Sequence, residues 1–154
     1  MGGSISSFGI RSFFAAEFNF HLDTQAAYVV MEVFPLVVIS SFDLALDLGT
    51  DKTINLFLDR TRPKAKLIND IHGIILSTHK PSLCDPLACI PVFSPEIITG
   101  IYKAYGRIEM GGNRTSGLLS LDWFKEDVKG KEKIWAISDI DAEKLVKSVN
   151  ESYN

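Results

Sequence analysis

The clearest helical pattern of apolar residues lies in the segment DTQAAYVVMEV, residues 23–33. Asp23 is a suitable N-cap for this helix, and Pro35 cannot continue it because proline lacks a backbone N–H. The segment is therefore predicted to be an amphipathic helix that ends before Pro35. The residues expected on its apolar face are Ala26, Ala27, Val30 and Met31.

The next segment, PLVVISSF at residues 35–42, is a continuous run of mostly apolar, β-branched residues. Such a run is typical of a strand that is buried on both faces, because a half-exposed strand alternates apolar with polar residues. A helix followed by a strand of this kind favours an α/β layer architecture.

The remaining patterning predicts further helices and short strands. The helices are expected over residues 65–78, 85–93 and 141–153. The strands are expected over residues 100–110, 115–124 and 133–138. Parallel α/β sheets usually begin with a buried strand and its crossover, whereas residues 1–12 read as a Gly- and Ser-rich loop. We therefore expect an α/β fold whose sheet lacks its first strands.

Composition agrees with a single globular domain over residues 1–154, since 46% of the residues are apolar and 23% are charged. The net charge of -3 offers no basic face for nucleic acid. Cys84 and Cys89 lack zinc-ligand spacing, and we expect them to be reduced rather than paired. The most apolar stretch, residues 28–40, contains Glu32 and Pro35 and is too short to span a bilayer.

The first residues, MGGSIS, fit the N-myristoylation pattern, with Gly2 and Ser6 at the required positions. A single myristoyl chain binds membranes only marginally, and no polybasic patch or nearby cysteine follows Gly2. The alternative reading is a glycine-rich loop that contains an internal methionine. Because no basic region followed by an apolar block marks a secretory signal, a cytoplasmic protein without a membrane partner is expected.

Three stretches carry residues that could do chemistry. In AAEFNFHLD, Glu17 and Asn19 would share one side of an extended segment and could grip a polyhydroxylated ligand, with Phe18 and Phe20 in the core. The plainer alternative is an edge strand with a polar face. In EMGGNRTSG, residues 109–117, the P-loop Lys-Ser/Thr is absent, so a turn between two strands is expected.

The third stretch is LCDPLA, residues 83–88. Asp85 before Pro86 is typical of a helix N-cap, and it could also act as a metal ligand that faces a pocket. Cys84 beside it fits a buried small apolar residue better than a pocket residue. The histidines lack regular ligand spacing, and a structural role is expected for them: His21, His72 and His79.

Taken in order, MGGS, AAEFNFHLDTQAA, LCDPLACIPVFSPEI and GGNRTSGLLSLDW resemble the inosine/uridine-preferring nucleoside hydrolase family. The family's A-E-F-N-x-x-x-D-P-E-A-A block is matched from Ala16 to Ala27, with Thr24-Gln25 in place of Pro-Glu. Its D-P-L-A block is matched from Asp85 to Ala88. The resemblance covers nearly the whole chain but only the C-terminal half of the family's domain.

This resemblance implies the C-terminal part of an open, mostly parallel, Rossmann-like sheet with flanking helices. It also implies hydrolysis of the N-glycosidic bond of ribonucleosides with the help of a bound calcium ion, through an oxocarbenium-like transition state. The family is commonly homo-oligomeric, so a homodimer or homotetramer is expected.

The same resemblance assigns roles to individual residues. Glu17 and Asn19 would bind ribose hydroxyls, and Met1 would lie against the sugar. Asp85 would ligate calcium and touch the ribose, and Cys84 takes a position often held by a histidine that protonates the leaving base. A ribose-binding asparagine of the family pattern is replaced by Arg11.

The family's D-x-D-x-x-x-D-D block, which supplies most metal ligands and the general base, has no match. The aspartates of SFDLALDLGTD, residues 41–51, have the wrong spacing and are better read as the start of a helix. Calcium takes about 6–8 oxygen ligands, far more than Asp85 alone supplies. We therefore expect this chain alone not to bind calcium or hydrolyse nucleosides. The alternative is a relative without catalysis that serves as a binding or subunit-interaction protein.

Overall fold

The computed structural model describes residues 1–6, 15–48, 61, 64, 66–67, 70, 84–124 and 132–152. Its helices are α1 (Phe18–Leu22), α2 (Thr24–Val33), α3 (Phe42–Leu48), α6 (Cys84–Phe93), the 3-10 helix η2 (Pro95–Ile97) and α7 (Ala142–Ser152). Its strands are β1 (Val37–Ser40), β2 (Ile98–Ile108), β3 (Leu119–Asp122) and β4 (Ile134–Ile140). The helix expected over 65–78 lies largely outside the described residues.

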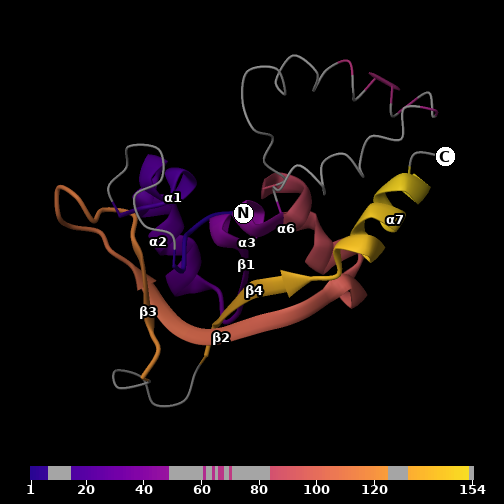
Figure 1. Ribbon diagram of the computed structural model, residues 1–154. Helices are drawn as coiled ribbons and strands as arrows, with labels where there is room; N and C mark the ends of the chain where they lie inside the picture. The colour runs from indigo at the N-terminus through magenta and orange to yellow at the C-terminus, as the bar shows by residue number, and fades with distance from the viewer. Residues whose placement is uncertain are drawn as a thin grey trace.

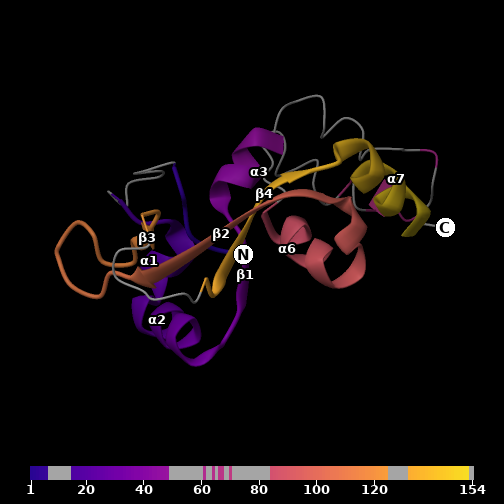
Figure 2. The same cartoon turned by 90° about the horizontal axis from the view of Figure 1, so that it is seen from below.

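The four strands form one strongly curved sheet in the order β1-β4-β2-β3 (Figures 1 and 2). β1 runs parallel to β4, with Val37 opposite Ile134, whereas β2 is antiparallel to both β4 and β3. The expected α/β class with flanking helices is confirmed. The described sheet is mixed rather than mostly parallel. The connection between β2 and β3 is too short for the crossover that parallel neighbours require, so these two strands pair antiparallel.

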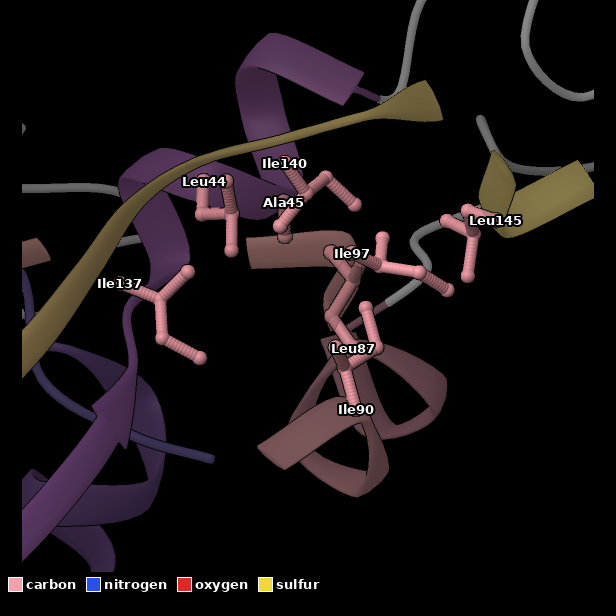
Figure 3. Packing of buried hydrophobic residues seen from close by; sticks show 8 residues of the cluster. All are labelled: Leu44, Ala45, Leu87, Ile90, Ile97, Ile137, Ile140 and Leu145. Atoms are coloured by element: carbon pink, nitrogen blue, oxygen red, sulfur yellow. The ribbon is translucent and has the colours of Figure 1, made fainter. Parts of the chain in front are cut away.

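Helices cover both faces of the sheet, and β4 contributes to both cores through its alternating residues. Ile137 packs on one face with residues of α3, α6 and α7 (Figure 3). Ile134 and Ala136 pack on the other face with Met31 of α2 and Ile39 of β1. Each fully buried Ile or Leu contributes about 1.5–3 kcal/mol relative to an exposed one. β4 is therefore the central strand that holds the two layers together.

The α2 helix begins and ends as its sequence predicts. The Asp23 carboxylate accepts a hydrogen bond from the Ala26 backbone N–H at 2.9 Å, and the helix ends at Val33, two residues before Pro35. Its expected apolar face is only partly covered, which corrects the sequence-based expectation. Met31 is buried, whereas the side chain of Val30 is 43% exposed.

Strand β1 also differs from the expectation of burial on both faces. Ile39 and Ser40 are buried, but the side chain of Val38 is 42% exposed. β1 stands at the edge of the sheet and pairs only with β4 among the described strands. The physical reason is that an edge strand has a neighbouring strand on one side only among the described strands, which leaves part of Val38 accessible to solvent.

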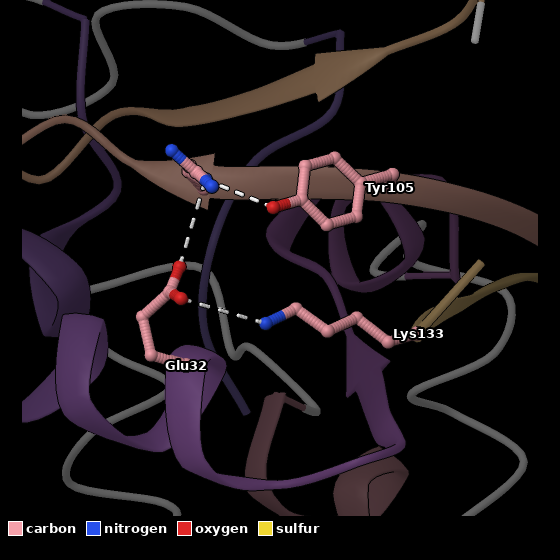
Figure 4. Close-up of polar contacts among 4 residues, drawn as sticks. Glu32, Tyr105 and Lys133 are labelled. Atoms are coloured by element: carbon pink, nitrogen blue, oxygen red, sulfur yellow. Dashed lines mark hydrogen bonds and ion pairs between the residues drawn. The ribbon is translucent and has the colours of Figure 1, made fainter. Parts of the chain in front are cut away.

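A charged cluster joins α2 to the sheet on the side of β2 and β4 (Figure 4). The Glu32 carboxylate lies 3.7 Å from the Arg107 Nε and 3.9 Å from the Lys133 Nζ. Arg107 donates a hydrogen bond to the Tyr105 hydroxyl at 2.9 Å. This bond and the Tyr105 and Glu32 charges raise the pKa of the Arg107 guanidinium. The cluster therefore ties the last turn of α2 to β2 and to the residue that precedes β4.

Candidate sugar-facing site

Glu17 organises the site: its own backbone is extended, but the segment that follows it is a helix and not the extended segment that was expected. It is the N-cap of α1, and its carboxylate accepts hydrogen bonds from the backbone N–H groups of Asn19 and Phe20 at 3.0 and 3.3 Å. The same oxygen, Oε2, accepts from the Gly3 N–H at 3.0 Å. The side chain is only 7% exposed. One buried carboxylate thus joins the N-terminal loop to the start of α1.

Asn19 and Met1 lie together at this junction. The Asn19 Nδ2 lies 3.1 Å from the Met1 Sδ and donates to the Met1 carbonyl oxygen at 3.4 Å. Phe20 packs beneath the loop, and a Cβ at Gly2 would approach its ring to 2.3 Å. Phe18, which was expected in the core, is 47% exposed because the helix turns it outward. The structure therefore brings together three of the residues that the sequence singled out: Met1, Glu17 and Asn19.

The other end of the loop is held by Asp43 at the start of α3. Its carboxylate accepts from the backbone N–H groups of Ile5 and Ser6 at 2.6 and 3.0 Å, and from the hydroxyl groups of Ser4 and Ser6. The sequence placed Asp43 only at a helix start. No local signal marks this role, because the loop and Asp43 are almost forty residues apart.

The hairpin loop between β2 and β3 supports α1 from the opposite side. The His21 Nδ1 contacts the Ser116 carbonyl oxygen at 3.1 Å, and the Thr24 and Ser116 hydroxyl groups are 3.3 Å apart. This confirms the expected turn between two strands and gives His21 a structural contact. His72, His79 and Arg11 lie outside the described residues.

A groove of about 420 Å³ runs from this junction along α2 and the edge of β1. Its polar end is formed by Met1, Asn19 and Asp23. Its apolar end is formed by one side of α2 and by residues 37–39. The polar end offers amide, carbonyl and carboxylate groups next to a thioether, which suits a ligand with hydroxyl groups and an apolar face.

Asp85 and Cys84 lie on a separate element. α6 begins at Cys84, one residue before the predicted cap, and Asp85 is exposed in its first turn. Cys84 is half-buried against the core cluster that includes Leu87, as expected for a small apolar residue, and neither cysteine is disulfide-bonded. Among the described residues, no hydrogen bond or ion pair joins Asp85 to Met1, Glu17 or Asn19.

The described residues do not fit a calcium site. Calcium takes about 6–8 oxygen ligands, and Asp85 supplies at most two. No group of three or more His, Cys, Asp or Glu side chains is placed to hold a metal within the described part of the chain. The helices described there also include none that is long and apolar enough to cross a membrane.

Helices on both faces of a curved sheet, with a polar loop at one strand end, define an α/β protein with a candidate site for a hydroxylated ligand. Residues 1–147 match the model of the inosine-uridine preferring nucleoside hydrolase family. The chain belongs to this family. No curated protein matches its sequence at a significant level.

Solved structures of nucleoside hydrolases share the fold. An inosine-guanosine nucleoside hydrolase matches with a TM-score of 0.83 and 20% identity, over 99% of this chain and 50% of that chain. A purine-preferring ribonucleoside hydrolase from Gardnerella vaginalis has a TM-score of 0.71 and 19% identity, over 97% and 49%. A plant nucleoside hydrolase has a TM-score of 0.71 and 17% identity, over 97% and 51%. The chain thus spans about half the length of these proteins.

Proposed function

We propose that this chain carries the sugar-facing part of a ribonucleoside hydrolase site. The observation that supports it is the junction at which Glu17 orients both the Met1–Gly3 loop and Asn19. Family membership points to the substrate class, and the polar end of the groove has the chemistry that a ribose needs. In this role the Met1 thioether lies against the sugar ring, and the Asn19 side chain binds a hydroxyl group.

Glu17 has a double role in this proposal. Among the residues that the structure describes, three backbone N–H groups donate to its Oε2, whereas only the Asn19 N–H donates to its Oε1. A carboxylate oxygen has two lone pairs, so Oε1 retains capacity for a sugar hydroxyl. The carboxylate would therefore fix the loop through one oxygen and bind ribose through the other.

The direct test of sugar binding is chemical-shift mapping with ribose and with inosine on isotope-labelled chain. Shifts confined to Met1, Asn19 and their neighbours, lost in Asn19→Ala but kept in Asn113→Ala, are the expected result. Asn113 is an exposed asparagine of the hairpin loop and is the matched control. Shifts that persist in Asn19→Ala would contradict the assignment.

We further propose that the chain alone does not hydrolyse nucleosides. Asp85 would be one calcium ligand and Cys84 would stand at the leaving-group position, but neither supplies a base that activates water. A panel of purine and pyrimidine nucleosides with calcium, scored for released reducing sugar, should give no turnover. Turnover that Asp85→Ala abolishes would refute this proposal.

A second candidate function is subunit interaction by a relative without catalysis. The observation that favours it is the exposed apolar surface on α2 and the β1 edge, which includes Val30, Val33 and Val38. Homo-oligomerisation in the cytoplasm, as expected from the family, would use such a surface. Saturable ribose binding separates the two candidates, because an interaction protein that had lost its site would show none.

A further inference from the structure

A second cavity, of about 490 Å³, opens at the carboxyl end of β1, where Ser41 follows the strand. Met1 and Gly2 line the groove described above, whereas Ile5 and Ser6, at the other end of the N-terminal loop, line this cavity. Among the described residues, the two spaces share no lining residue. In open α/β sheets, ligands bind outside the carboxyl ends of the strands. The cavity therefore has the size and the place of a ligand site that is separate from the candidate sugar site.

Two aromatic rings line this cavity. Tyr102 of β2 and Trp123, which follows β3, contact each other edge to face, with ring centroids 6.0 Å apart and ring planes at 89°. The two residues are 52% and 49% exposed, so each ring keeps surface that a ligand can reach. The face of an aromatic ring is electrically negative and attracts a cation, most strongly in tryptophan. Beneath the rings, Leu44 and Ile137 belong to the buried core (Figure 3) and give the cavity an apolar floor.

The charge of the cavity is negative. Asp43 and Asp47 of α3 both line it, and the described lining residues include no lysine, arginine or histidine. The Asp43 carboxylate is engaged by the backbone N–H groups of Ile5 and Ser6. Asp47 is exposed, and within the described part of the chain no ion pair joins its carboxylate to a basic side chain. Asp47 is therefore the carboxylate that is available to a bound cation.

The other polar groups of the cavity are hydroxyl groups that can accept hydrogen bonds. The Ser6 hydroxyl donates to the Asp43 carboxylate at 2.8 Å, which leaves the lone pairs of its oxygen for an N–H donor. Ser41 and Ser138 add two further hydroxyl groups. A primary ammonium group has three N–H donors and no acceptor, so it complements a carboxylate and hydroxyl oxygens together.

We propose that this cavity binds a primary alkylammonium ligand, with the ammonium group beside Asp47 and the alkyl chain against Tyr102 and Trp123. A neutral polyol would also suit the rings and the hydroxyl groups, but it would gain nothing from the negative charge of Asp47. The proposal goes beyond the sugar-facing role and does not depend on it, because the two sites use different residues.

The experiment is titration of the isotope-labelled full chain with butylammonium chloride, followed by NMR through the indole N–H resonances. The chain has two tryptophans, and Trp135 is not among the residues that line the cavity, so its indole is an internal reference. A saturable shift of the Trp123 indole is expected, with no such shift in sodium chloride or in neutral 1-butanol at the same concentrations. An equal shift with 1-butanol, or a shift at Trp135 alone, would overturn the proposal.

Two variants test the two halves of the ligand. Asp47→Asn should weaken butylammonium binding about threefold, because it removes an exposed charge contact. Tyr102→Ala should weaken it about fivefold, whereas Tyr102→Phe keeps the ring and should bind as the unmodified chain does.

Each variant has a matched control outside the cavity. Glu96→Gln neutralises an exposed carboxylate of η2, and Phe124→Ala removes an 85% exposed ring next to Trp123 that does not line the cavity. Both controls should bind normally. Unchanged binding in Asp47→Asn and Tyr102→Ala would refute the proposal. A chain that binds ribose but not butylammonium would refute only this proposal, and the reverse result would refute only the sugar-facing role.

Discussion

Glu17 shows how one buried carboxylate can be tested separately for structure and for ligand binding. Glu17→Ala leaves three backbone N–H groups without their acceptor, which should cost about 2–3 kcal/mol of unfolding free energy. Glu17→Gln keeps one acceptor oxygen and should cost less. Urea denaturation measures both, with the exposed Glu96→Ala as the control. Equal stabilities of Glu17→Ala and Glu96→Ala would show that the cap is dispensable.

The position of Glu17 also shows what spacing alone can predict. Two polar residues two positions apart fit the alternating sides of a strand, and they equally fit an N-cap and the second residue of a helix. The choice is made by the Gly3 N–H, which bonds to Glu17 from fourteen residues away. The sequence thus predicted that Glu17 and Asn19 act together, but their conformation depends on a contact that no local pattern contains.

At the scale of elements, the β2–β3 hairpin loop is packed closely against α1. Gly117 has φ +89°, and a Cβ there would lie 2.8 Å from both the His21 Cα and the Phe20 carbonyl oxygen. Gly117→Ala should therefore destabilise the chain by about 2 kcal/mol or more. Gly111→Ala is the control, because its Cβ would meet only the Glu109 Oε1 at 3.4 Å. Thermal unfolding of the two variants should differ clearly, and equal midpoints would contradict the close approach.

The α7 helix carries a predictable dependence on pH. The Asp141 carboxylate accepts from the Lys144 backbone N–H at 3.0 Å and pairs with the Lys144 ammonium at 3.0 Å, and these contacts lower the pKa of Asp141. A depressed folded-state pKa stabilises the fold above the unfolded pKa, and this contribution disappears as pH falls through the folded value. Asp141→Asn should flatten the loss of stability below about pH 4, where unfolded aspartates titrate. Glu143→Gln, in the same turn, is the control. If Asp141→Asn lost stability at low pH as steeply as the unmodified chain, protonation of Asp141 would not be linked to stability.

Most elements were predictable because their signals are local. Asp23 and Pro35 bound α2, and the short apolar run within residues 133–138 predicts β4. The environment of an element is not local, and there the expectations were wrong. Val30 and Val38 have apolar side chains of the kind that is usually buried. Their exposure depends on which segments, distant in sequence, pack against α2 and β1.

At the scale of the whole molecule, the sheet order could not be read from the chain. β4 lies between β1 and β2, although nearly one hundred residues separate β1 from β4. The candidate site could not be assembled from the sequence for the same reason. Its N-terminal loop, the start of α1 and the start of α3 are distant in sequence, and contacts of Gly3, Glu17 and Asp43 join them. The family motifs nevertheless identified the residues of the junction, because a motif records which side chains are used without stating how they are arranged.

The exposed apolar surface leads to a last prediction about the chain on its own. Val29 and Val33 of α2 are 54% and 68% exposed, and exposed apolar surfaces of this kind associate in water. The average mass measured by light scattering should therefore rise with concentration, and solubility should be low. The double variant Val29→Lys/Val33→Lys should lower this association, because lysine side chains remain hydrated. Gln25→Lys is the control, because it adds a lysine at an exposed polar residue of the same helix without removing apolar surface. A wild-type chain that stays monomeric at all concentrations and melts sharply would mean that the surface is not adhesive, and that the groove needs no partner to be stable in water.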